Sequence, residues 1–407
     1  MACWRGQDEN GAHLLIARPA AWNGRLVVHV HGGPRMVATR PDTSDEDLLR
    51  YAEFLQEGWA FAATSRRAPG FGVTRAVEDT ENARRAAVET LGPPRMTVLH
   101  GQSWGAAVAA KAIETMNAPG PDGHRPWDAA LLTAGVLAGP SRAYDMRVDL
   151  LAAYAAICGS GEVPWQFGPT PPATPAVREE VIDRYRACTG AHLAPEARTP
   201  AQRRALADLA AASRVPDWAI AGHLWWATRI LGDITRNITG GHSAFGNEAV
   251  RYAGTSDDAA FNARVPRIRP DPEAAARLAA DGDLTGRIGI PVLTLHGTGD
   301  STVLVENEAA YRATVEAAGT EDHLVQVFVD EGEHQKLSPV LYPTALSLLA
   351  RWAETGEHPT QAAFRARCEA MRSAYPGDCR VLADYAPEPW EARVNPRHPP
   401  ATLAGRR

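Results

Sequence analysis

The sequence predicts an α/β fold in which a mostly parallel sheet is flanked by helices and carries a helical insertion. Two observations predict it. Short apolar segments alternate with helix-like segments near both ends of the chain, which is the pattern of parallel βαβ units. In the middle, the pattern changes to amphipathic helical segments broken by Pro and Gly. We expect a core of residues 1–138 and 285–356, a helical lid of 139–284, and a C-terminal extension of 357–407 packed on the core.

The first strands and helices alternate in order. Residues 13–18 form an apolar run before Asn23-Gly24, and residues 25–30 form a second run that stops at Gly32-Gly33. A helix-like stretch, a strand and a second helix follow, and Gly92-Pro93-Pro94 closes the second helix. These three elements are expected at residues 45–57, 59–64 and 77–91.

The same alternation continues on both sides of the insertion. Residues 96–100 form a strand that leads directly into an Ala-rich helix over 106–116, and residues 129–136 form the last strand before the insertion. Past the insertion, two further strands each precede a helix. We expect the strands at 291–296 and 324–329 and the helices at 307–318 and 342–353.

A Gly-x-Ser-x-Gly motif, Gly101-Gln102-Ser103-Trp104-Gly105, lies between a predicted strand and a predicted helix. A sharp strand-to-helix turn exposes the serine hydroxyl, and the flanking glycines leave room for the chain that crosses it. We therefore predict Ser103 as a nucleophile.

A serine hydroxyl of ordinary acidity needs a base, and the base needs a group that orients it. Asp300 follows the strand 291–296 in a glycine-rich loop, and His334 follows the strand 324–329. The chain order Ser, Asp, His is the order that the strand–turn–helix nucleophile motif requires. We predict a triad of Ser103, His334 and Asp300.

Other acidic and imidazole side chains compete for these roles. Asp330 and Glu333 also carry carboxylates, but they are too close to His334 in sequence to match this order. Histidines within or at the ends of strands are expected to be structural, and one before a strand is expected at the surface. The strand histidines are His29, His31, His100 and His296, and the surface one is His323.

Acyl transfer also needs donors for the developing oxyanion. The backbone N–H of Trp104, directly after the nucleophile, is one candidate. The loop His31-Gly32-Gly33-Pro34-Arg35 supplies the other, and Gly33 is the expected donor because Pro34 has no N–H.

His-Gly-Gly-Pro together with Gly-x-Ser-Trp-Gly, a late Gly-Asp loop and a late His resembles α/β-hydrolases of the esterase and proline-iminopeptidase-like groups. The resemblance covers residues 25–137 and 285–355 and implies an eight-stranded, mostly parallel sheet, a serine triad and no cofactor. Arg35 stands where those peptidases usually have glycine, and the insertion has no evident acidic cluster for a substrate amine. Both departures weaken the assignment as a peptidase.

Aromatic side chains concentrate in the insertion and suit an apolar or aromatic ester. We assign substrate binding to Arg35, Trp225, Trp226 and Phe245, and the same group of aromatics includes Trp165 and Phe167. The expected function is hydrolysis of a small carboxylic ester through an acyl-enzyme, without metal or cofactor. The alternatives are a peptidase or amidase and a non-catalytic binding protein on the same fold.

The net charge of −6 is spread without long like-charge runs, which disfavours nucleic acid as a partner. No apolar run approaches the roughly 20 residues that span a bilayer, and the amino terminus lacks the features of a signal peptide. The composition is that of a GC-rich bacterial chain.

Four of the five cysteines form two local pairs, Cys158 with Cys188 and Cys368 with Cys379, and Cys3 is left over. Disulfides in these pairs predict an extracellular or periplasmic protein, and reduced thiols predict a cytoplasmic one.

Overall fold

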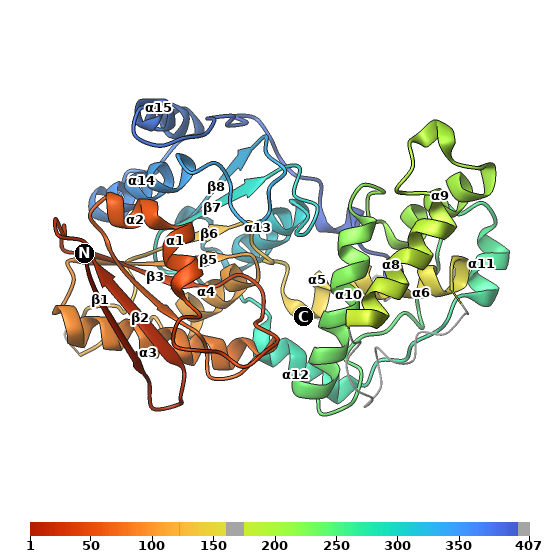
Figure 1. Ribbon diagram of the computed structural model, residues 1–407, viewed down its shortest axis with the longest axis horizontal. Helices are drawn as coiled ribbons and strands as arrows, with labels where there is room; N and C mark the ends of the chain where they lie inside the picture. Colours follow the sequence, from red (N-terminus) through yellow and green to blue (C-terminus); the bar gives the residue numbers. More distant parts are fainter. Residues whose placement is uncertain (122, 160–174, 398–407) are drawn as a thin grey trace, which may run out of the picture. The chain divides into compact units, whose positions relative to one another are not determined.

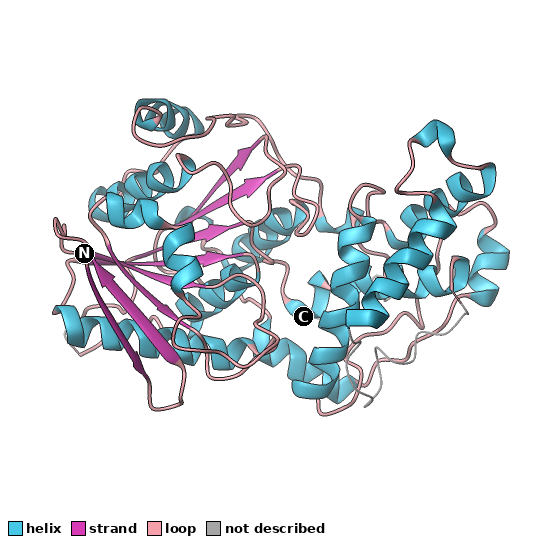
Figure 2. Cartoon of the chain, viewed as in Figure 1, coloured by secondary structure: helices cyan, strands magenta, loops and turns pink. Residues whose placement is uncertain are grey.

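The computed structural model describes residues 1–121, 123–159 and 175–397, which form two compact units (Figure 1). Residues 1–139 and 281–387 form the sheet unit. Residues 140–280, together with the tail from residue 388, form the helical unit. Within the described residues every strand belongs to the sheet unit, whereas the helical unit contains helices and loops (Figure 2).

The sheet has eight strands in the order β1-β2-β4-β3-β5-β6-β7-β8. The strands β1 and β2 pair antiparallel, β2 also pairs antiparallel with β4, and every pair from β4 to β8 is parallel. This mostly parallel sheet with flanking helices confirms the predicted fold class. The strands are β1 (Ala2–Gln7), β2 (His13–Arg18), β3 (Arg25–Val30), β4 (Ala60–Thr64), β5 (Met96–Gln102), β6 (Ala129–Thr133), β7 (Val292–Gly297) and β8 (Leu324–Val329).

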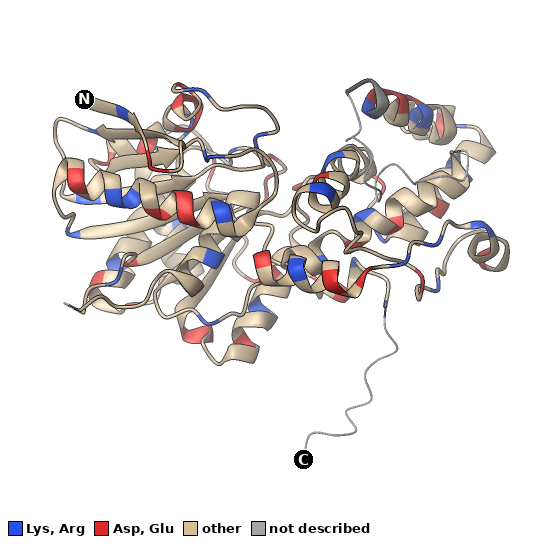
Figure 3. Cartoon of the chain, turned by 90° about the horizontal axis from the view of Figure 1, so that it is seen from below, with Lys and Arg blue, Asp and Glu red and all other residues tan. Residues whose placement is uncertain are grey.

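Helices cover both faces of the sheet. α3 and α4 pack together on one face, and α2, α14 and α15 pack together on the other (Figure 1). Figure 3 shows acidic and basic residues mixed along the helices of the chain. The helices of this unit are α1 (Asp45–Arg50), α2 (Ala52–Gln56), α3 (Val73–Leu91), α4 (Trp104–Thr115), α13 (Glu306–Ala318), α14 (Leu341–Thr355) and α15 (Gln361–Met371).

The hydrophobic core forms because alternate strand residues point to the same face. Its members include Val27 of β3, Val98 of β5 and Val327 of β8, which are fully buried. They pack with apolar residues of α14, such as Leu341 and Leu349. The central strands are buried on both faces, which explains why they appear in the sequence as continuous apolar runs.

Four elements differ from the sequence prediction. β1 was not expected, because four of its six side chains are exposed and it has no apolar run. The helix expected at 45–57 is two short helices that separate at Tyr51. β6 ends at Thr133 instead of residue 136, because Ala134 adopts a positive φ of 47°.

The fourth difference is the start of α3, at Val73 instead of Val77. Asp281 accepts hydrogen bonds from the backbone N–H groups of Val73 and Thr74, at 2.9 and 3.1 Å. These N–H groups have no partner inside a helix, so a carboxylate from outside stabilises the extra turn. The cap lies 208 residues away in sequence.

The helical unit contains α5 (Pro140–Ala143), α6 (Asp145–Ile157), α8 (Pro175–Thr189), α9 (Pro200–Ser213), α10 (Ile220–Asn237), α11 (Asp258–Arg264) and all but the last two residues of α12 (Pro272–Gly282). Buried Asp149 accepts hydrogen bonds from Tyr252, Asn395 and Arg397. The C-terminal extension from residue 357 is therefore divided between the two units. Residues 357–387 belong to the sheet unit, whereas residues 388–397 belong to the helical unit, which differs from the expectation that the whole extension packs on the core.

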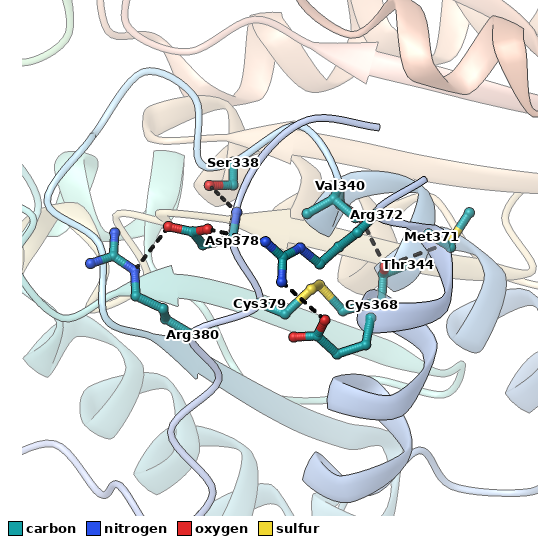
Figure 4. The surroundings of a disulfide bond; sticks show 10 residues. Ser338, Val340, Thr344, Cys368, Met371, Arg372, Asp378, Cys379 and Arg380 are labelled. Atoms are coloured by element: carbon teal, nitrogen blue, oxygen red, sulfur yellow. Dashed lines mark hydrogen bonds and ion pairs between the residues drawn. A yellow bond between two sulfur atoms is a disulfide. The ribbon is translucent and has the colours of Figure 1, made fainter. Parts of the chain in front are cut away.

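Both expected cysteine pairs are disulfides, with Cα–Cα distances of 5.5 Å for Cys158–Cys188 and 5.8 Å for Cys368–Cys379, and Cys3 is free. Figure 4 shows the second bridge between α15 and the segment beyond it. That segment pairs with β8, because the Leu382 N–H donates to the Phe328 carbonyl at 2.9 Å. The bridge therefore holds in place the segment that covers β8, an edge strand of the sheet. No described helix is long and apolar enough to cross a membrane.

We expect the double variant Cys368→Ser/Cys379→Ser to lose on the order of 2–3 kcal/mol of unfolding free energy, because the unfolded chain is no longer cross-linked. Urea unfolding measures the change, and Cys3→Ser is the matched control, expected to unfold like the wild type. Peptide mapping under non-reducing conditions should recover both pairs. Equal stability of the double variant and the wild type would contradict this expectation.

Candidate active site

Ser103 occupies the turn between β5 and α4, with φ 57° and ψ −123°. An L-residue rarely adopts such a backbone, and the close passage of the chain on both sides explains it. A Cβ on Gly101 would lie 2.4 Å from the Gly105 carbonyl oxygen, and one on Gly105 would lie 2.3 Å from that of Val30. Only glycine fits at either position, so the motif that predicted the turn is also what permits it.

The structure brings together the three residues of the predicted triad. Asp300 lies in the loop after β7 and His334 in the loop after β8, so both stand with Ser103 at the carboxyl edge of the sheet. His334 Nε2 is 2.8 Å from Ser103 Oγ, and His334 Nδ1 is 2.6 Å from Asp300 Oδ2. The side chain of His334 is 16% exposed, whereas that of Asp300 is fully buried.

A strand–serine–helix turn at the centre of this sheet, followed by acid and histidine loops after later strands, decides the topology. The chain has the α/β-hydrolase fold.

No protein-family model matches the sequence, and no curated protein matches it. Among solved structures, feruloyl esterase B from Aspergillus oryzae is similar with a TM-score of 0.48 and 15% identity over 88% of this chain and 81% of that one. Candida antarctica lipase A is similar with a TM-score of 0.44 and 13% identity, over 91% of this chain and 85% of that one. Acylaminoacyl peptidase from Pyrococcus horikoshii is similar with a TM-score of 0.38 and 10% identity, over 82% of this chain and 37% of that one. Likeness at this level does not bear on substrate or activity.

Asp300 is held ionised in this α/β-hydrolase site. Its Oδ1 accepts hydrogen bonds from the N–H groups of Thr302 and Val303, at 2.8 and 2.9 Å. Burial opposes ionisation, but the neighbouring imidazoles of His334 and His296 and the hydrogen bonds from His334 and Val303 outweigh it and lower the pKa of Asp300. A charged acceptor therefore faces His334 Nδ1, which identifies that nitrogen as the donor and leaves Nε2 to accept the serine proton.

His296, which the sequence analysis treated as structural, lies beside this carboxylate. Its Nδ1 is 3.0 Å from Glu308 Oε1, and its Nε2 is 2.9 Å from the Val303 carbonyl oxygen. Burial lowers the pKa of His296, but the hydrogen bond and charge of Glu308 and the charge of Asp300 outweigh this and raise it. This buried imidazole, whose surroundings favour its charged form, stands 3.7 Å from Asp300 Oδ2.

The predicted oxyanion loop is held by Arg66, which the sequence analysis did not single out. Gly33 has φ 65°, and its carbonyl accepts a hydrogen bond from Arg66 Nη1 at 2.9 Å. Arg66 also donates to the His31 carbonyl, and its guanidinium lies 4.6 Å from the ring of Trp104. Burial, with repulsion from Arg35, lowers the pKa of Arg66 to about 9, so the guanidinium stays largely charged at neutral pH. Arg66 thereby joins the two segments that carry Gly33 and Trp104.

Gln102, the variable residue before the nucleophile, lies between the oxyanion loop and the histidine loop. Its Nε2 donates to the His334 carbonyl at 2.8 Å. A Cβ on Gly32 would lie 1.8 Å from Gln102 Oε1. Only its position in the motif could have drawn attention to Gln102, because an amide side chain at that position does not by itself indicate a function.

The other residues assigned to substrate binding each have partners within their own unit. Arg35, after Gly33 and Pro34, pairs with Glu46 at 2.7 Å and with Asp47 at 3.2 Å. Trp225 and Trp226 form an edge-to-face pair on α10, with Arg229 against both rings, and Phe245 is buried within the helical unit. Trp165 and Phe167 lie outside the described residues.

The carboxylates that competed with Asp300 are exposed. Asp330 lies 3.8 Å from Arg380, and Glu333 is also exposed. The carboxylate hydrogen-bonded to His334 is that of Asp300.

Proposed function

We propose that the chain is a serine hydrolase that cleaves carboxylic esters through an acyl-enzyme. The observation that carries the proposal is the continuous hydrogen-bonded chain from Ser103 Oγ through the two nitrogens of His334 to buried Asp300. The 2.8 Å contact allows direct transfer of the Ser103 proton to His334 Nε2, and the 2.6 Å contact lets Asp300 orient the ring. In this proposal Ser103, His334 and Asp300 act as nucleophile, general base and orienting acid.

The chemistry follows from these positions. As Ser103 attacks the ester carbonyl, its proton passes to His334 Nε2, and Asp300 stabilises the imidazolium. The N–H groups of Gly33 and Trp104 receive the oxyanion. His334 then protonates the departing alcohol, and a water molecule, activated by the same nitrogen, releases the acid and regenerates Ser103.

An ester rather than an amide is the proposed substrate. The carboxylates next to the oxyanion loop, Glu46 and Asp47, are already paired with Arg35. They are therefore poorly suited to bind a substrate ammonium group, as an aminopeptidase would need. Assays of p-nitrophenyl esters of graded acyl length against amino-acid anilides test this. Ester hydrolysis faster by orders of magnitude is expected, and faster anilide hydrolysis would indicate the peptidase alternative.

The assignment of Arg35, Trp225, Trp226 and Phe245 to substrate binding stays a prediction. For the compartment, we propose an oxidising one, because two disulfides are formed and reducing compartments keep such pairs as thiols.

We further propose that His296 and Glu308 position Asp300 electrostatically. Glu308 accepts hydrogen bonds from Thr294 at 2.6 Å and Gln326 at 2.7 Å, besides facing His296. This buried carboxylate supports a positive His296 next to Asp300. The positive charge keeps Asp300 ionised without letting it bind the proton on His334 too strongly.

We expect Glu308→Gln to move the acidic limb of the pH profile of kcat/KM to higher pH, on the order of one unit. Without its carboxylate partner His296 loses its positive charge, so Asp300 holds the proton on His334 more tightly. Glu316→Gln, on the exposed side of the same helix, is the matched control. A folded Glu308→Gln variant with an unchanged profile would contradict this role.

A further inference from the structure

A second cluster of donor atoms lies beside the oxyanion loop and takes no part in the proposed reaction. It consists of His29 on β3, His31 directly after β3, and Asp47 on α1. One nitrogen from each histidine and one carboxylate oxygen lie within 4.8 Å of one another. Asp47 Oδ1 is 2.7 Å from His31 Nδ1 and 3.5 Å from His29 Nε2. All three residues belong to the sheet unit.

Hydrogen bonds on the Nδ1 side of His29 determine which of its ring nitrogens is left without a hydrogen-bond partner. The Thr133 hydroxyl donates to the Gly101 carbonyl at 3.3 Å, so it accepts from His100 Nε2 at 3.2 Å. The other nitrogen of neutral His100 is then an acceptor, and His29 Nδ1 donates to it at 2.9 Å. The His100 ring is fully buried between a hydroxyl and an imidazole, surroundings that favour the uncharged ring.

His29 Nε2 is left as the atom that faces Asp47. His29 is 1% exposed, and this nitrogen has no hydrogen-bond partner. In the neutral ring its lone pair points toward a carboxylate that is itself 1% exposed. Two electron-rich atoms facing each other in the interior require a cation between them, which is either a proton or a metal ion.

We propose that His29, His31 and Asp47 bind a divalent transition-metal ion of the zinc class. Two imidazole nitrogens and one carboxylate oxygen are a typical ligand set for zinc, whereas Mg²⁺ and Ca²⁺ prefer oxygen ligands alone. Glu46 Oε1, 3.7 Å from His31 Nδ1, or a water molecule completes the tetrahedron. With metal–ligand bonds of roughly 2.0–2.1 Å, the ligand atoms of a tetrahedral site are about 3.3 Å apart. His31 Nδ1 and Asp47 Oδ1 must therefore separate, and their hydrogen bond opens.

The site is accessible from the surface. A cavity of about 540 Å³ is lined by His31, Arg35 and Glu46. An ion entering there reaches the His31 side of the cluster first.

Arg35 sets the affinity of the site. Its guanidinium contacts Asp47 at Oδ2, the oxygen that does not face the histidines, and it also pairs with Glu46. Because Arg35 contacts Oδ2, Asp47 Oδ1 is available to an ion once the hydrogen bond from His31 opens. The positive charge of Arg35 repels that ion. We therefore expect Arg35→Gln to bind the metal at least tenfold more tightly than the wild type, an increase that adventitious surface binding does not predict.

The test uses the full chain after treatment with a chelator. Zn²⁺ binding is measured by competition with a chromogenic chelator, and Co²⁺ is added separately because its absorption spectrum reports tetrahedral coordination by nitrogen and oxygen. We expect one tightly bound ion per chain, and a tetrahedral Co²⁺ spectrum. Asp47→Asn and His31→Gln should each weaken binding at least tenfold. Affinity should fall as the pH is lowered, because protons compete for the imidazoles.

His334→Gln is the control, because the proposed catalytic histidine and Asp300 could also bind an ion. Binding retained in His334→Gln supports the proposed site, and binding abolished there overturns it. The proposal also fails if the wild type binds no stoichiometric ion, or if folded His31→Gln binds like the wild type. If Asp47→Asn does not fold, His31→Gln and Arg35→Gln carry the test, because their side chains lie at the cavity instead of in the core.

Discussion

Ser103→Ala is expected to lower ester hydrolysis by about four to six orders of magnitude while leaving the fold intact. The hydroxyl is the proposed nucleophile, and neither His334 nor Asp300 can replace it in forming an acyl-enzyme. Alanine adds no atoms, and the strained backbone at position 103 is maintained by Gly101 and Gly105. The measurement is kcat for a p-nitrophenyl ester, with circular dichroism and thermal unfolding as checks of the fold.

Thr133→Val is a matched control near the same turn. The Thr133 hydroxyl hydrogen-bonds with His100 and Gly101 and not with the proposed triad. A modest change in activity is expected. Should folded Ser103→Ala keep activity near that of the wild type, the acyl-enzyme mechanism would have to be abandoned, whatever the geometry of the triad.

Asp300→Asn is expected to reduce kcat by about four orders of magnitude at neutral pH. The N–H groups of Thr302 and Val303 require an oxygen acceptor at the Oδ1 position, so the amide oxygen of the asparagine occupies it. The amide NH₂ then faces His334 Nδ1 as a donor. His334 must carry its proton on Nε2, in the tautomer that cannot accept the proton of Ser103.

Asp330→Asn is the control, because Asp330 was the competing acid and its exposed carboxylate faces Arg380. It should keep nearly full activity. Severe loss in Asp330→Asn together with mild loss in Asp300→Asn would mean that the orienting acid is misassigned.

The predictions that follow from local sequence have a common physical basis. Buried parallel strands must be continuous apolar runs, and helices between them must have one apolar face, so the class of the fold is encoded in short windows. The turn at Ser103 is equally local. The two glycines are needed for the close contacts of the crossing chain, and they stand two residues on either side.

The order of Ser103, Asp300 and His334 along the chain also pointed to a candidate site before any distance was known. Parallel strands end at one edge of the sheet, so loops that are far apart in sequence meet there. The hydrogen bond from His334 to Asp300, with Asp330 directed to Arg380, could be seen only in the tertiary structure.

Several features were decided by contacts between distant segments. The first turn of α3 depends on Asp281, which lies 208 residues away in sequence. The end of the tail joins the helical unit through Asn395 and Arg397 at Asp149. None of these partners lies within a sequence window that sets local propensity.

The charged groups around the site show most clearly which properties follow from the sequence and which depend on the folded structure. A sequence reveals that a residue is His, Glu or Arg, but the charge it carries depends on burial and on the partners that burial brings. The raised pKa of His296 depends on Glu308, the loop held by Arg66 depends on two carbonyl groups, and the free nitrogen of His29 depends on His100. By itself the sequence determined the strands other than β1, the turn at Ser103 and the identity of the candidate triad. Only the tertiary structure decided the protonation and pairing of the groups around it, because desolvation and long-range hydrogen bonds arise when the chain is folded.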